Sequence, residues 1–118
     1  MQANKFVNGT LDDYVRGCFK TSPNSTFSWF LICSYAYYCR YESLMSDTAF
    51  DGMCKYMLKN YDSLEHVNKS LVSREMLEAG SGYNLKEEDY PTRVKVIAEG
   101  LIREWYNDRD CGATNGSN

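Results

Sequence analysis

The chain has 118 residues, of which 43% are hydrophobic and 25% charged, and its formal net charge at pH 7 is −3. This length and composition predict one globular domain whose core needs no metal or disulfide, and they leave no room for a second domain. The acidic balance and scattered basic residues argue against a general nucleic-acid binder, which usually carries a basic face.

The five cysteines are scattered along the chain and are accompanied by a single histidine. No two cysteines form a CxxC pair, so we expect free thiols and no metal site. An odd number of cysteines fits a reducing compartment. The longest apolar run, residues 27–39, is too short to cross a membrane, and the N-terminus lacks the apolar region of a signal peptide. The sequence therefore predicts a cytoplasmic protein with no membrane association.

The first half of the chain predicts three helices. Residues 1–9 resemble a loose arm, after which Thr10 can cap a helix over residues 11–20. A turn with a proline follows, and a stretch that is apolar on nearly every side then predicts a buried central helix ending near Tyr41. Its aromatic start also suits a strand, but the run is long and lacks turn signals. The third helix starts at Ser46 or Asp47, and its apolar stripe is Phe50, Met53, Cys54, Met57, Leu58 and Tyr61.

The second half predicts short helical pieces and one long helix. A short piece falls within residues 62–71, and Ser73 can cap another over residues 74–79, which Gly80 ends. Pro91, at a first-turn position, opens the last long helix. The buried stripe of that helix is Val94, Ile97, Ala98, Leu101, Ile102 and Trp105.

These elements together predict an all-α fold. We expect a compact single domain over residues 1–110, built from about four main helices and several short helical segments. Residues 111–118 are rich in glycine and asparagine and predict a disordered tail.

A polar cluster lies where the second predicted helix gives way to the third. Tyr37 and Tyr38 close the apolar run, and Asp47 and Asp51, four residues apart, share a face of the next helix beside Phe50. The helix dipole favours carboxylates in a first turn, so capping and solvation alone can explain the aspartates. Core filling can likewise explain the tyrosines. The alternative is a ligand site built from these side chains.

The spacing of this cluster resembles the small helical domain at the N-terminus of NAD-dependent bacterial DNA ligases. That family carries a Tyr-His pair, eight intervening residues and then Asp-x-x-Tyr-Asp. Tyr37, Asp47 and Asp51 fall on the matching positions without a gap, whereas Tyr38 stands in place of the histidine and Phe50 in place of the tyrosine. The resemblance implies that these five residues bind the nicotinamide mononucleotide half of NAD.

The resemblance covers residues 27–62, about a third of the chain. No KxDG motif is present, and adenylation chemistry needs that lysine as its nucleophile. The sequence therefore excludes a self-sufficient ligase.

Two other features stand outside the cluster. His66 is a weak general-base candidate, because no nucleophile is marked nearby. Residues 79–83 form a glycine-bearing loop without the P-loop pattern, which either stops a helix or lets the backbone approach a ligand. Together with Lys69 and residues 90–93, they resemble small phage proteins built on the same helix pair, which implies a location in the host cytoplasm.

Three functions remain open from the sequence. The first is a stand-alone nucleotide-binding module that holds NAD, nicotinamide mononucleotide or a related small nucleotide. The second is a phage accessory factor that uses the same helical scaffold to bind a host protein. The third is a nucleotide hydrolase that uses His66 and the aspartates as acid and base. The sequence names neither the ligand nor the partner.

Overall fold

A computed structural model describes residues 5–114, of which 108–114 are described by their backbone alone. The all-α prediction is confirmed, because the described residues form helices and turns with no strand beyond an isolated bridge between Val7 and Thr10. The α-helices are α1 (Asp12–Thr21), α2 (Thr26–Arg40), α3 (Asp47–Lys59), α4 (Arg74–Ala79) and α5 (Thr92–Thr114). Short 3-10 turns lie at Pro23–Ser25, Lys69–Leu71 and Glu87–Asp89.

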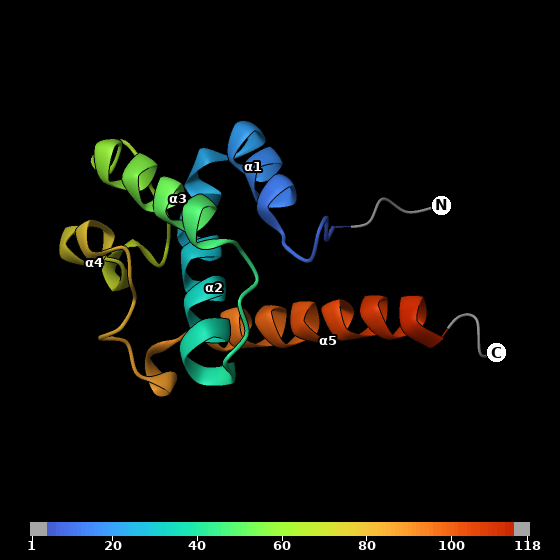
Figure 1. The fold of residues 1–118 in the computed structure, drawn as a ribbon. Helices are drawn as coiled ribbons and strands as arrows, with labels where there is room; N and C mark the ends of the chain where they lie inside the picture. The colour runs from blue at the N-terminus through green and yellow to red at the C-terminus, as the bar shows by residue number, and fades with distance from the viewer. Residues whose placement is uncertain (1–4, 115–118) are drawn as a thin grey trace.

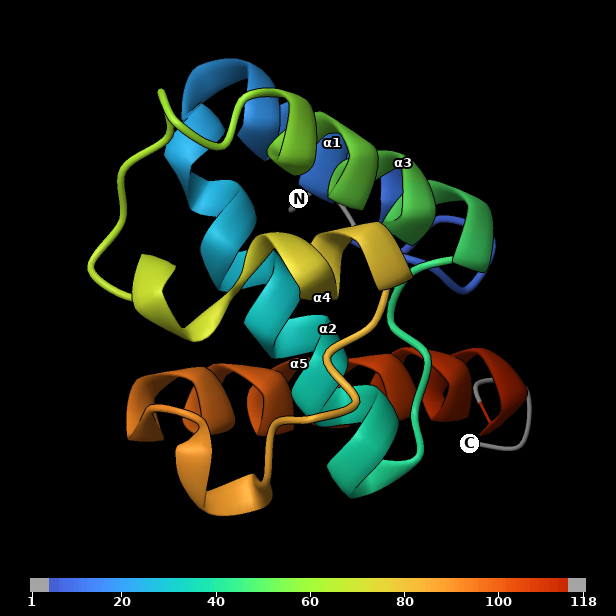
Figure 2. The ribbon, with the colours of Figure 1, turned by 90° about the vertical axis from the view of Figure 1, so that its left-hand side faces the viewer.

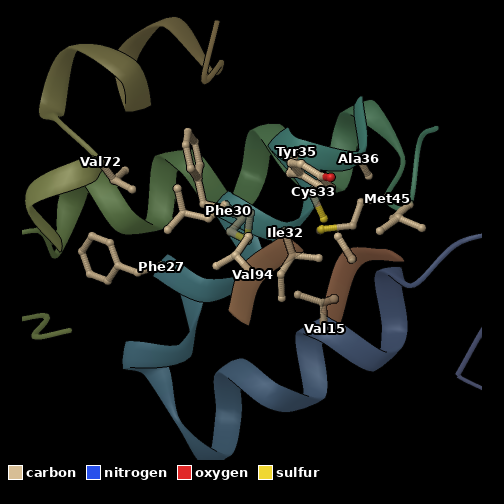
Figure 3. Packing of buried hydrophobic residues seen from close by; sticks show 14 of the residues in the cluster. Val15, Phe27, Phe30, Ile32, Cys33, Tyr35, Ala36, Met45, Val72 and Val94 are labelled. Atoms are coloured by element: carbon tan, nitrogen blue, oxygen red, sulfur yellow. The ribbon is translucent and has the colours of Figure 1, made fainter. Parts of the chain in front are cut away.

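The central helix is α2, as its sequence predicts. Every residue of α2 from Phe30 to Ala36 is buried. In Figures 1 and 2, α1 and α3 lie across one end of α2 and α5 crosses the other end. The close view in Figure 3 shows buried side chains of α2, among them Phe30 and Ile32, gathered in one cluster with Val15 and Val94. A helix that is apolar all round can be stable only when neighbours cover all of its faces.

A left-handed residue at the end of α2 turns the chain back toward α3. Tyr41 has φ +61°, and the N–H of Glu42 bonds to the carbonyl of Ala36 at 2.9 Å, a helix-ending geometry that usually employs glycine. The connection then runs back along α2 (Figure 1). The N–H of Leu11 donates to the carbonyl of Leu44 at 2.8 Å, which ties this connection to the start of α1.

A network of hydrogen bonds and ion pairs joins α2 to α5. The Tyr35 hydroxyl and the Arg40 guanidinium both donate to the carboxylate of Glu99, each at 2.8 Å. Arg40 also lies over the Tyr35 ring at 4.9 Å and pairs with Glu87 at 3.4 Å. Burial and the neighbouring Glu99 raise the pKa of Tyr35 to about 12, so the phenol stays protonated and keeps its donor role.

The structure departs from the sequence prediction mainly in α5. The helix continues to Thr114, beyond the predicted domain end at residue 110, because each residue added to an existing helix gains a hydrogen bond. Pro91 precedes the first helical residue rather than lying in the first turn. Ile97 of the predicted buried stripe is 39% exposed, because it lines an open groove together with Tyr14 and Trp29. Residues 115–118 of the predicted tail lie outside the described residues.

The first turn of α3 provides a stability test. Ser46 is the N-cap, and its hydroxyl accepts the N–H of Ala49 at 3.2 Å. We expect Ser46→Ala to lower the free energy of unfolding by about 0.5–2 kcal/mol, because the cap hydrogen bond is lost. Ser70→Ala is the control, since Ser70 is exposed, and it should change stability by less than about 0.5 kcal/mol. Urea unfolding measures both, and equal effects would contradict the assignment of the cap.

Candidate functional site

A pocket of about 190 Å³ lies between the C-terminal half of α2, the connection to α3, the first turn of α3 and the loop after α4. A larger depression of about 460 Å³ between α1 and α3 is more open to solvent. The residues that line the smaller pocket are Cys33, Ser34, Tyr37, Tyr38, Ser43, Leu44, Met45, Asp47, Phe50, Gly80, Ser81 and Gly82.

The structure brings four of the five residues of the predicted site to this pocket. Tyr37, Tyr38, Asp47 and Phe50 all line it. Asp51 does not, because its Oδ2 atom pairs with the Nζ atom of Lys55 one turn further along α3, at 3.1 Å. Its Oδ1 atom lies 3.5 Å from the position that a Cβ on Gly80 would take. Asp51 therefore borders the pocket from outside.

The two tyrosines have different surroundings. Their rings meet edge to face with centroids 5.0 Å apart, and Tyr37 is the more exposed at 53%. The Tyr38 hydroxyl bonds to the hydroxyl of Ser81, which also accepts the N–H of Tyr83 at 3.1 Å. Tyr38 thus links α2 to the loop after α4, whereas the exposed face of Tyr37 is open to a ligand.

Phe50 is shared between the pocket wall and the core. Its ring stacks on the buried ring of Phe30, with centroids 5.4 Å apart and an interplanar angle of 28°. The side chain is half-buried, so one part contacts the core and the other lines the pocket. A phenylalanine here supplies an apolar surface without a hydroxyl.

The loop after α4 closes the pocket by approaching α2 closely. Gly80 has φ +67° and ends α4, and the N–H of Ser81 then bonds to the carbonyl of Met76 at 3.0 Å. Gly82 lies directly on Ser34, where a Cβ would come within 2.8 Å of the serine Oγ atom. Only glycine permits this contact without a shift of the loop or of α2.

Ser34 and Gly82 are the pocket residues that the sequence analysis did not identify. Ser34 is only 2% exposed, and its Oγ atom has no hydrogen-bond partner among the described residues. The sequence signal for it is a serine that interrupts the most apolar stretch of the chain. Beside it, burial raises the pKa of the Cys33 thiol far above its usual range, so this neutral thiol adds to the apolar wall.

The charge on the pocket lining is negative. Asp47 is the one carboxylate among its lining residues, and these residues include no lysine, arginine or histidine. An anionic group inside the pocket would therefore meet a carboxylate and no compensating cation. The arrangement favours a ligand part that is neutral or positively charged.

His66 lies outside this pocket. Its Nδ1 atom accepts the N–H of Asn68 at 3.0 Å, so the proton of the neutral ring is on Nε2 and donates to the hydroxyl of Ser28 at 2.9 Å. The lone pair that a general base needs is thus already used. Ser28 precedes Tyr37 by nine residues on α2, about 13 Å along the helix axis. The proposed acid–base pairing of His66 with the aspartates therefore has no geometric support.

A comparison with family models, with curated proteins and with solved structures finds no match to this chain. The resemblance to the ligase domain therefore stays a prediction from spacing.

Three further structural findings concern metal binding, the cysteine thiols and membrane-spanning helices. No group of three His, Cys, Asp or Glu residues in the described range is placed to hold a metal ion. The four cysteines with described side chains are free thiols, and the side chain of Cys111 lies outside this set. Within residues 5–114, no helix combines the length and the apolar character needed to cross a bilayer.

The contact between Gly82 and Ser34 predicts opposite effects for two glycine-to-alanine changes. Gly82→Ala should lower the free energy of unfolding by about 1–3 kcal/mol, because the new methyl group overpacks the contact with α2. Gly52→Ala, in the open interior of α3, should raise it by about 0.4–1 kcal/mol. Urea unfolding of the two variants and the wild type measures both. A stabilising Gly82→Ala would show that the loop is not packed on Ser34.

The histidine predicts a pH dependence of stability. Burial lowers the pKa of His66 below its usual 6.5, so the unfolded chain binds a proton more readily than the folded chain. The contribution of neutral His66 to the free energy of unfolding is fully present above about pH 6.5, and it is lost as the pH falls through the pKa of the folded state. The stability difference between wild type and His66→Gln should therefore shrink from pH 8 to pH 5. NMR titration of this single histidine should give a pKa below 6.5. A pH-independent difference would contradict the prediction.

Proposed function

We propose that the protein is a nucleotide-binding module that holds the nicotinamide end of NAD, nicotinamide mononucleotide or a related small nucleotide, without ligase chemistry. One observation carries the proposal. Tyr37, Tyr38, Asp47 and Phe50, which the ligase resemblance implies as binding residues, line one pocket although they come from two helices.

The size of the pocket indicates which part of a nucleotide it accepts. A cavity of about 150 Å³ can hold a benzene ring, whereas whole drug-sized ligands occupy about 300–1,000 Å³. A pocket of about 190 Å³ therefore suits a single six-membered ring. The ribose and phosphate of a nucleotide would remain at the mouth or in solvent.

The chemistry of the pocket suits an oxidised nicotinamide ring. This ring is a planar cation, and the face of a tyrosine or phenylalanine attracts cations through its negative electrostatic potential. Tyr37 and Phe50 supply such faces, and Asp47 supplies a carboxylate. A ribose hydroxyl near the mouth can also donate to Asp47. Because the lining residues carry no positive charge, the phosphate belongs outside the pocket.

A protein partner is the second candidate function. Three tyrosines on segments that border the pocket are exposed: Tyr37 at 53%, Tyr41 at 86% and Tyr83 at 67%. Tyrosine is enriched at the energetically important centres of protein interfaces. If the protein is phage-encoded, the partner would be a host protein. This alternative uses the same surface, so a bound nucleotide and a bound partner would compete.

Calorimetric titration with nicotinamide mononucleotide and NAD tests the proposal. We expect binding to the wild type at millimolar concentration or below. Asp47→Asn should weaken it about tenfold to a hundredfold, since a hydrogen bond to a charged group contributes about 1.5–3 kcal/mol. Asp51→Asn is the matched control, because it removes a carboxylate from the same end of α3 outside the pocket and should weaken binding less.

The controls separate the two candidate functions. If neither nucleotide binds, the nucleotide-binding proposal is wrong and the protein-partner candidate replaces it. If one binds and Asp51→Asn weakens binding more than Asp47→Asn, the ligand lies on the outer face of α3 rather than in the pocket.

A further inference from the structure

Three aromatic rings line the pocket between α2 and the loop after α4, and we refer to these rings, of Tyr37, Tyr38 and Phe50, as the aromatic cage. The protein itself holds two of them in place. Phe50 stacks on the buried ring of Phe30 with centroids 5.4 Å apart, and the Tyr38 hydroxyl bonds to that of Ser81. The ring of Tyr37 meets that of Tyr38 edge to face at 5.0 Å. Because the cage is already formed in the free protein, a ligand would not have to order these rings.

Asp47 is the one charged residue on the lining of this pocket. The next carboxylate along α3, that of Asp51, is paired with Lys55 at 3.1 Å, whereas Asp47 has no ion pair within the described residues. A carboxylate attracts a cation by its charge, and an aromatic face attracts a cation by its negative electrostatic potential. The aromatic cage and Asp47 therefore favour the same kind of ligand group.

The pocket offers few hydrogen-bond acceptors to a cation that carries N–H groups. The hydroxyls of Tyr38 and Ser81 bond to each other, and that of Ser81 also accepts the N–H of Tyr83. Gly82 packs directly over the buried hydroxyl of Ser34. A primary ammonium group has three N–H donors that need acceptors, whereas a quaternary ammonium group has none. The lining thus favours a cation whose nitrogen is bonded to carbon atoms alone.

We propose that the aromatic cage and Asp47 bind a quaternary ammonium group, as found in choline and in the side chain of trimethylated lysine. Aromatic faces recognise such groups by cation–π attraction. A trimethylammonium group is close to a benzene ring in size, and a cavity of about 150 Å³ can hold benzene, so a pocket of about 190 Å³ can enclose it. The inference goes beyond the proposed function, because it requires no nucleotide. Both ligands would compete for the same pocket.

Calorimetric titration with choline and two analogues tests the inference. Dimethylbutanol, in which carbon replaces the nitrogen, has the shape of choline without its charge, and ethanolamine has the charge without the methyl groups. The wild type should bind choline at millimolar concentration or below, and at least about tenfold more tightly than either analogue. In NMR spectra, the methyl proton signal of bound choline should move upfield, because ring currents shield protons that lie over an aromatic face.

Two pairs of substitutions locate the bound cation. Asp47→Asn should weaken choline binding about threefold to tenfold, whereas Asp51→Asn, outside the pocket, should change it by less than about twofold. Tyr37→Leu should weaken it about threefold to tenfold, because it removes one aromatic face. Tyr14→Leu is the matched control, since Tyr14 is an exposed tyrosine that lines a different groove, and it should leave the affinity unchanged.

A further titration with the N-acetylated amide of trimethyllysine distinguishes two sources of the group. Tighter binding of this derivative than of choline supports a site for a modified protein side chain, and tighter binding of choline supports a site for a free small molecule. Both results agree with recognition of a quaternary ammonium group.

The contrary outcomes are equally clear. The inference is overturned if choline binds no more tightly than dimethylbutanol, or if Asp47→Asn and Tyr37→Leu leave its affinity unchanged. If nicotinamide mononucleotide binds and choline does not, the inference is overturned and the proposed function stands. If choline binds and neither nicotinamide mononucleotide nor NAD does, the inference stands and the proposed function is wrong.

Discussion

The burial of α2 on nearly every side is the constraint on which the rest of the structure depends. Its apolar residues, from Phe30 to Ala36, must be covered, and α1, α3 and α5 do this from different directions. The connection after Tyr41 and the loop around Gly82 then have to pass close to the same helix. The pocket forms where these two passing segments and the first turn of α3 leave the C-terminal half of α2 incompletely filled.

The starts and ends of several helices depend on nearby residues, and these could be predicted well from the sequence. Ser46 caps α3, Ser73 caps α4 and Gly80 ends α4, all as the sequence indicates, because each effect depends on residues within one helical turn. The continuation of α5 to Thr114 was not predicted. Glycine and asparagine in its last part suggested a tail, although a helix that already exists extends at little cost.

The candidate site could be predicted only in part, because several of its contacts join residues that are far apart in the sequence. Spacing within a helix placed Asp47 and Asp51 on one face and also allows Lys55 to pair with Asp51, but it could not show that only Asp47 lines the pocket. The bond between Tyr38 and Ser81 joins residues 43 positions apart, and the contact of Gly82 with Ser34 spans a similar distance. No periodicity within a single helix contains such information.

The two serines that interrupt the apolar run of α2 have opposite environments, and the contrast assigns their roles. Ser28 receives a hydrogen bond from His66, whose other ring nitrogen is occupied by the N–H of Asn68. That local network is complete, so His66 is a structural residue that stabilises the start of α2. Ser34 is more deeply buried and has no such partner. The chain thus satisfies the first serine with its only histidine, whereas Gly82 of the loop after α4 packs directly over the second.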